Sequence, residues 1–185
     1  MTTLNVHTIE SAPEASKPLL EQSVKSFGML PGLHAVLASS PKTLEAYKAL
    51  HGFFQDSSFN ADELTVVWQT INVEHECHYC VPAHTGIAHM MKVSAEITDA
   101  LRNRTPLPTE KLQVLHDFTL IVVRNRGHVT QTDLDTFYGA GYGEQQVLEV
   151  ILGLSQKVIS NYTNHIAHTP VDAPFQKFAW EPQEA

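Results

Sequence analysis

The two cysteines of the chain, Cys77 and Cys80, are separated by two residues, and His84 stands four positions after Cys80. A thiol reacts as its thiolate, and the ordinary pKa of a cysteine is about 8.5. If a helix begins near His78, Cys80 lies in its first turn, where unpaired backbone N–H groups stabilise an anion. His84 then lies one turn further on the same face, where it can accept the thiol proton or, as a cation, stabilise the thiolate. The spacing predicts a redox pair in which Cys80 attacks an electrophilic oxygen or sulfur and Cys77 closes a disulfide.

The same stretch allows two other interpretations. Four residue types that bind zinc occur within ten positions: His75, Cys77, Cys80 and His84. Zinc sites usually draw their ligands from two separated clusters, however, and a single helix rarely surrounds a tetrahedral ion. Alternatively, the two cysteines only pack. For His75, His78 and His89 a solvated or structural role is the simpler interpretation, so we expect neither a metal nor a cofactor.

The composition limits which classes of protein and which kinds of partner are compatible with this chain. A chain of 185 residues with 43% hydrophobic residues can bury a core and fits a single domain. Its net charge of -8 argues against nucleic acid or an anionic membrane as a partner. No apolar run approaches the roughly 18–20 residues of a membrane span, and no signal peptide is visible. We expect a cytoplasmic protein, in which a closely spaced cysteine pair indicates catalysis or metal binding.

Helical periodicity runs through most of the chain, and no segment shows the alternation of a strand. Helices are predicted over residues 15–27, 31–38, 41–55, 60–74, 78–92, 94–102, 109–125 and 144–165. Asn60 and Glu63 have the spacing of a capping box, and Thr130 and Asp133 cap a further short helix. We therefore predict one all-α domain over 1–185, with an N-terminal arm (1–12) and an extended C-terminal tail (170–185).

Two patterns concern the surroundings of the cysteines. Residues 64–89 and 147–168 both run from an apolar helix into Ile-Ala-His, which suggests a degenerate two-fold repeat that kept its chemistry only in the first copy. One helical face carries Cys80, His84, Ile87, Ala88 and Met91. That face predicts a partly buried site behind a narrow, apolar entrance near a subunit contact.

The segment CHYCVPAHTGIA, residues 77–88, resembles the carboxymuconolactone decarboxylase superfamily, and most closely its alkylhydroperoxidase AhpD-like, peroxidase-related branch. The resemblance extends to the helix from Asn60, the long helix after residue 143 and the tail VDAPFQKFAW. It implies an all-helical fold, assembly into homotrimers or hexamers, and peroxiredoxin-type activity. It also implies that Cys80 is the peroxidatic cysteine, Cys77 the resolving one and His84 part of the proton relay. A hydroperoxide would be the substrate and a dithiol the electron donor.

The chain departs from this pattern at the proton relay. The relay glutamate of AhpD usually stands twelve residues before the first cysteine, where this chain has Thr65. Threonine cannot exchange protons at neutral pH as a carboxylate does. Glu63 points to another side of the helix, whereas Glu74 and Glu76 are candidates to replace the missing carboxylate. AhpD also tends to have a histidine where this chain has Tyr79.

Two other functions remain open at this stage. One is decarboxylation of a carboxylated lactone, although the true decarboxylases of the superfamily generally lack the cysteine pair. The other is a non-enzymatic oligomer that uses the disulfide as a redox switch.

Overall fold

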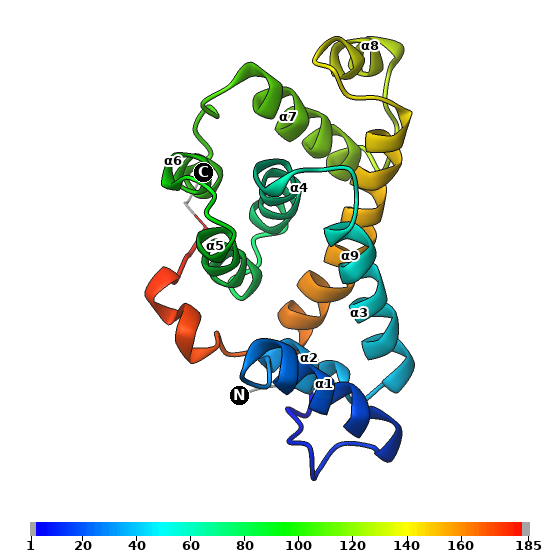
Figure 1. The fold of residues 1–185 in the computed structure, drawn as a ribbon, viewed down its shortest axis with the longest axis vertical. Helices are drawn as coiled ribbons and strands as arrows, with labels where there is room; N and C mark the ends of the chain where they lie inside the picture. Colours follow the sequence, from blue (N-terminus) through cyan, green and yellow to red (C-terminus); the bar gives the residue numbers. More distant parts are fainter. Residues whose placement is uncertain (1–2, 183–185) are drawn as a thin grey trace.

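The structure is a computed structural model that describes residues 3–182, and these residues form helices but no strand (Figure 1). The α-helices are α1 (Lys17–Phe27), α2 (Gly32–Leu37), α3 (Pro41–Gln55), α4 (Ala61–Glu74), α5 (Cys80–Met90), α6 (Ala95–Asn103), α7 (Glu110–Arg124), α8 (Gln131–Gly139) and α9 (Glu144–Ala167). Two short 3-10 helices are η1 (Glu14–Ser16) and η2 (Ala173–Phe178). The predicted all-α class is confirmed. None of the described helices combines the length and apolarity that crossing a membrane requires.

Helix α4 is the centre of the bundle, with α5, α6, α7 and α9 packed around it (Figure 1). All of its residues from Glu63 to Val73 are buried, which explains why the segment is apolar on several sides. Helix α3 lies along α9, and Gly153 permits their close approach. A Cβ atom at Gly153 would lie 2.8 Å from the ring of Phe54.

The predicted helix starts agree well with the structure because local hydrogen bonds fix them. The side chain of Asn60 accepts hydrogen bonds from the N–H groups of Asp62 and Glu63, and Glu63 Oε2 accepts one from the Asn60 N–H. Thr130 and Asp133 form a second capping box at the start of α8. The helix after the cysteine motif is shorter than predicted, since it begins at Cys80 rather than at residue 78.

The second half of the suggested repeat differs in local structure from the first. Residues 64–89 are broken into α4, a short loop and α5, whereas residues 147–168 belong to one uninterrupted helix up to Ala167. The loop that carries Cys77 therefore has no counterpart in α9.

The C-terminal tail is not fully extended, as the sequence suggested, because Ala173–Phe178 folds into the 3-10 helix η2. This helix packs on α5, where Gly86 leaves room for the Phe175 ring. Arg102 holds the following segment by donating hydrogen bonds to the carbonyl oxygens of Phe178 and Ala179. Residues 1–2 of the predicted arm and 183–185 of the predicted tail lie outside the described part of the chain.

Candidate active site

The end of α4 positions the first cysteine. The N–H of Glu76 donates to the carbonyl of Val73, and the N–H of Cys77 donates to the carbonyl of Asn72. These two bonds form a Schellman motif, in which Glu76 takes the left-handed conformation with φ of 53°. A glycine usually occupies that position, so the loop keeps a less favourable backbone conformation directly beside Cys77. After His78 and Tyr79, α5 begins with Cys80 as its first residue.

A buried network of amide side chains connects this loop with α4 and α9. Gln69 donates to the carbonyl of Val81 at 3.1 Å, and Asn72 donates to the carbonyl of Cys80 at 3.4 Å. Asn161 of α9 donates to the side-chain oxygen of Asn72 at 3.0 Å. Buried amides of this kind are costly unless they are paired, so the network holds the loop in one conformation.

The two cysteines have opposite acid–base properties. Both are free and buried, and the N–H of Cys80 donates to Sγ of Cys77 at 3.3 Å. Burial alone would raise the pKa of Cys80, but the hydrogen bond from Cys77, the charge of Lys157 and the amide of Asn164 lower it to about 5. The hydrogen bond to Cys80, together with burial, raises the pKa of Cys77 well above its ordinary value. Near neutral pH, these shifts favour the thiolate at Cys80 and the protonated thiol at Cys77.

The positive charge beside Cys80 comes from α9. Lys157 is fully buried (0% exposed), and its Nζ donates to Nε2 of His84 at 2.9 Å. Burial and the nearby Lys157 hold the pKa of His84 well below its ordinary value, so the imidazole is neutral. Since Nε2 accepts a hydrogen bond, the ring proton resides on Nδ1, which has no hydrogen-bond partner among residues 3–182. His84 thus lies in the predicted site, but as the partner of a lysine.

The carboxylates considered for the proton relay lie elsewhere. Glu63 caps α4 and pairs with Lys111 at 3.0 Å, Glu74 pairs with Arg124 at 2.7 Å, and Glu76 lies 3.6 Å from Arg104. The Thr65 hydroxyl donates to the carbonyl of Ala61 within its own helix. The proposal that Glu74 or Glu76 replaces the relay carboxylate is therefore wrong, because both side chains form ion pairs away from Cys80.

A small cavity of about 90 Å³ has Cys80, His84 and Lys157 in its wall. Asp172 closes one side of it by accepting hydrogen bonds from the Tyr79 hydroxyl at 2.6 Å and from the Gly32 N–H at 3.0 Å. A second cavity of about 450 Å³ adjoins the first, and both share Phe27, Pro31, His51, Ile87, Met90 and Phe175. We call this second cavity the vestibule. Its described lining contains no lysine, arginine, aspartate or glutamate, so the space that adjoins the cavity at Cys80 is mostly apolar.

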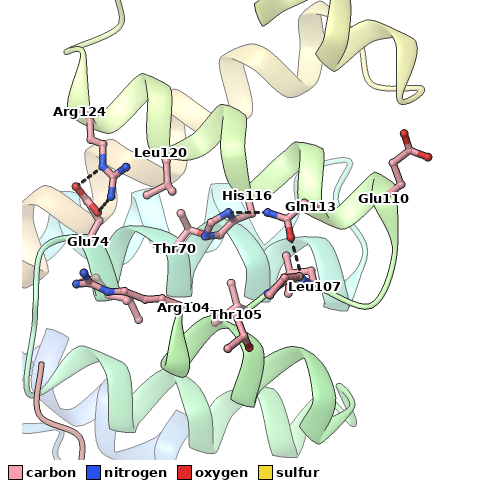
Figure 2. Close-up of a pocket in the computed structure, with 13 residues that line it drawn as sticks. Thr70, Glu74, Arg104, Thr105, Leu107, Glu110, Gln113, His116, Leu120 and Arg124 are labelled. Carbon is pink, nitrogen blue, oxygen red and sulfur yellow. Dashed lines mark hydrogen bonds and ion pairs between the residues drawn. The ribbon is translucent and has the colours of Figure 1, made fainter. Parts of the chain in front are cut away.

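A larger cavity of about 570 Å³ lies between α4, α7 and the loop after α6 (Figure 2). Figure 2 shows Arg124 paired with Glu74 at one end, and Gln113 bonded to His116 and Leu107 at the other. No cysteine lines it, and two of the charged residues that line it, Glu74 and Arg124, pair with each other. We therefore place the candidate active site in the smaller cavity, where the reactive sulfur is.

The other histidines of the motif have structural contacts. His75 Nδ1 lies 2.9 Å from the side-chain oxygen of Asn161, and His78 Nε2 lies 3.0 Å from the carbonyl of Thr169. His89 packs edge-on against the Phe178 ring. In the described part of the chain, no three His, Cys, Asp or Glu side chains are grouped as metal ligands. Of the four possible zinc ligands, His75 and His84 thus have partners other than the cysteines, namely Asn161 and Lys157.

The sequence interpretation missed the contribution of α9. Lys157, Asn161 and Asn164 are all fully buried, and Asn164 Nδ2 donates to Sγ of Cys80 at 3.3 Å. Their spacing of i, i+4 and i+7 places them on one face of the helix. Polar residues that recur at i, i+4 and i+7 within a helix that also has a wide apolar surface are the signal that could have identified them.

Comparison with solved structures identifies the fold. The AhpD core of an uncharacterized peroxidase-related protein from Ralstonia eutropha JMP134 superposes with a TM-score of 0.81 at 16% identity, covering 94% of each chain. A peroxidase-related protein from Silicibacter sp. TM1040 gives 0.80 at 16% identity, covering 94% of this chain and 93% of its own. A cysteine-to-alanine variant of the debrominase Bmp8, in complex with 2,3,4-tribromopyrrole, gives 0.77 at 14% identity, covering 96% and 95%. No protein-family model and no curated protein matches the chain. The AhpD-like fold expected from the motif is therefore established by structure.

Proposed function

We propose that this protein is a thiol-dependent peroxidase that reduces hydroperoxides through the Cys77–Cys80 pair. The observation that carries the proposal is the setting of the pair, since Cys80 lies against Cys77 and has the buried Asn164 and Lys157 around its sulfur. Cys80 is held as a thiolate by Lys157 and Asn164, while Cys77 beside it stays protonated. A nucleophilic thiolate adjacent to a thiol that can resolve its oxidised form is the arrangement that such a cycle requires.

The cycle has three steps. The thiolate of Cys80 attacks one oxygen of the hydroperoxide, the O–O bond breaks, and a sulfenic acid and an alcohol form. The thiol of Cys77 then displaces the hydroxyl group of the sulfenic acid, which leaves as water, and a disulfide joins the two sulfurs. A dithiol donor reduces this disulfide by thiol–disulfide exchange and is itself oxidised.

The surroundings of the thiolate favour an organic hydroperoxide. The vestibule offers apolar and aromatic surface, including Phe27, Met90 and Phe175, over which an apolar group can bind. The cavity at Cys80 holds the polar groups that would contact the peroxide end. The neighbours named for AhpD and for peroxidase-related proteins are consistent with this chemistry. Since the cycle starts from free thiols, we propose a reducing compartment such as the cytoplasm.

A coupled assay tests the proposal. The reduced protein is mixed with cumene hydroperoxide and excess dithiothreitol, and consumption of the peroxide is followed over time. Cys80→Ser should abolish catalysed consumption, because a hydroxyl is not ionised at neutral pH. Consumption by Cys80→Ser at the wild-type rate would contradict the proposal.

Reductive dehalogenation is a second candidate, favoured by the structural similarity to the debrominase Bmp8. Two cysteine thiols can supply two electrons and two protons, so that a carbon–bromine bond becomes a carbon–hydrogen bond, bromide leaves and a disulfide forms. The aromatic wall of the vestibule suits a planar ring. Incubation of the reduced protein with 2,3,4-tribromopyrrole, with bromide release measured by ion chromatography, separates this activity from peroxide reduction.

We also propose that the protein forms a homo-oligomer through α9. Leu148, Ile151, Tyr162 and Ile166 are exposed and fall within one 60° sector of the helix at 100° per residue. Leu148 and Ile166 are 66% and 61% exposed, and the stripe between them is about 27 Å long at 1.5 Å per residue. An apolar stripe of this length, interrupted by the exposed Ser155, favours burial against a second copy of the chain.

A further inference from the structure

Lys157 is a buried cation whose only close counter-charge comes from the cysteines. Its Nζ donates to a neutral imidazole, and no carboxylate among residues 3–182 forms an ion pair with it. The titratable groups that act on it are Cys77 in the loop before α5, Cys80 and His84 within α5, and His51 on α3. Burial lowers the pKa of Lys157, and the negative charge of Cys80 opposes that effect.

This arrangement couples the charge of Lys157 to the redox state of Cys80. While Cys80 is a thiolate, the ammonium and the sulfur form a buried pair of opposite charges. Once the sulfur becomes a sulfenic acid or a disulfide, it carries no charge, and the ammonium is left buried and uncompensated. An isolated buried ammonium is strongly unfavourable and tends to lose its proton.

When Cys80 is oxidised and the O–O bond of the hydroperoxide breaks, the leaving oxygen requires a proton. Resting on the peroxidase function proposed above, we propose that Lys157 is the general acid that protonates this oxygen. Lys157 lines the same cavity as Cys80, so its ammonium is within reach of a peroxide bound at the sulfur. It therefore occupies the role that a relay glutamate would have had at position 65.

The proton balance of the cycle closes with this assignment. In the first step the thiolate forms a sulfur–oxygen bond, the O–O bond breaks, and Lys157 gives its proton to the departing alkoxide. The products are a sulfenic acid, an alcohol and a neutral amine. The thiol proton of Cys77 then leaves with water as the disulfide forms. The dithiol donor returns two electrons and two protons, one to Cys77 and one through Cys80 to Lys157.

The neighbouring groups are less suited to this step. His84 is neutral, because burial and the charge of Lys157 disfavour its protonated form. The thiol of Cys77 retains its proton strongly, and that proton is needed later to form water. The carboxylate of Asp172 acts as an acceptor here, because it accepts hydrogen bonds from the Tyr79 hydroxyl and the Gly32 N–H.

The experiment compares two oxidants whose leaving groups differ in their need for a proton. Peroxyacetic acid releases acetate, which is stable as an anion, whereas tert-butyl hydroperoxide releases a strongly basic alkoxide. The rate of Cys80 oxidation is measured by stopped flow for wild type, Lys157→Met and Lys157→Arg. Each protein is measured above the pKa of its own Cys80 thiol, which alkylation determines separately. Lys42→Met is the control, because Lys42 is exposed on α3 and pairs only with Glu45.

Loss of a general acid should slow the oxidation of Cys80 by tert-butyl hydroperoxide by about 10²-fold or more. It should leave the rate of oxidation by peroxyacetic acid little changed. The arginine variant separates charge from proton donation, since arginine keeps its positive charge but does not release a proton near neutral pH. It should therefore retain the lowered Cys80 pKa and still lose the reaction with tert-butyl hydroperoxide. Circular dichroism establishes that each variant is folded, and the arginine variant carries the test if Lys157→Met does not fold.

Three other results would overturn the inference. If the variants react more slowly with both oxidants by the same factor, Lys157 acts only by stabilising the thiolate. Wild-type rates in both variants would remove Lys157 from the reaction altogether. Wild-type protein that reacts with neither oxidant would contradict the peroxidase function itself, and this inference with it.

Discussion

The ammonium of Lys157 and the imidazole of His84 lie 2.9 Å apart, joining two helices across 73 positions of the chain. The lysine comes from α9 and the histidine from α5, one turn after Cys80. This contact places a positive charge beside the reactive sulfur, where the sequence pattern led us to expect a carboxylate. The charge adds to the hydrogen bond from Cys77 in lowering the pKa of Cys80, and it adds to burial in lowering the pKa of His84.

The charge of Lys157 predicts an unusual pH profile for Cys80. Alkylation by iodoacetamide requires the thiolate, so its rate should rise with pH through a midpoint near 5 and stay level to pH 8. Below the midpoint the thiolate gains a proton and reactivity is lost. Mass spectrometry assigns the modified residue, and a midpoint near the ordinary value of about 8.5 would contradict the proposed charge state.

Replacement of Lys157 by methionine should change both reactivity and stability. Without the ammonium, burial dominates, and the alkylation midpoint of Cys80 should move up by at least one pH unit, on the order of 1.4 kcal/mol. The free energy of unfolding at pH 7 should fall, because removing one partner of a buried pair of opposite charges leaves the other without compensation. Urea unfolding and alkylation are measured on the same samples, with Lys42→Met for comparison. An unchanged midpoint would mean that Lys157 does not stabilise the thiolate.

Gly86 should be sensitive to the smallest substitution. A Cβ atom there would lie 2.5 Å from the Phe175 ring, so Gly86→Ala must displace η2 from α5. Overpacking of this kind costs about 1–3 kcal/mol of unfolding free energy. Limited proteolysis should then cut the tail after Pro170 faster than in wild type.

Gly52 is a matched control for Gly86, since nothing lies within 4 Å of the position that its Cβ would take. Gly52→Ala, within α3, should stabilise the protein by about 0.5–1 kcal/mol. Similar effects of the two substitutions on stability and on proteolysis would show that packing of the Phe175 ring on α5 does not require a glycine at position 86.

The apolar stripe on α9 predicts how the oligomer responds to charge. Leu148→Glu together with Ile166→Glu should dissociate the assembly into monomers, because a carboxylate cannot be buried unpaired. Sedimentation velocity gives the mass directly. Tyr138→Glu, which alters an exposed residue on α8, should leave the mass unchanged. A wild-type protein that sediments as a monomer would rule out the oligomer.

Much of the fold could be predicted from the sequence because its signals are local. Asn60 with Glu63 and Thr130 with Asp133 fix helix starts through hydrogen bonds over three residues. The inward face of α5 follows from helical spacing, and Cys80 is indeed only 2% exposed. Such contacts need no knowledge of how distant segments pack.

The missing part of the site depends on contacts between distant segments. The amide of Asn164 meets the sulfur of Cys80 across 84 positions, and Lys157 meets His84 across 73. The sequence around Lys157 does not indicate which distant residue this buried lysine will contact. The expectation of a relay carboxylate also failed for this reason, since the ion pairs of Glu74 and Glu76 are set by tertiary packing.

The central claim is that Cys80 is the nucleophile and Cys77 resolves it, and single-turnover mass spectrometry tests this directly. Reduced protein is treated with one equivalent of cumene hydroperoxide, quenched and digested. We predict a Cys77–Cys80 disulfide in wild type, a sulfenic acid on Cys80 in Cys77→Ser that dimedone traps, and no oxidation of Cys77 in Cys80→Ser. A wild-type Cys80 that remains reduced, or a sulfenic acid that forms first on Cys77, would contradict the claim.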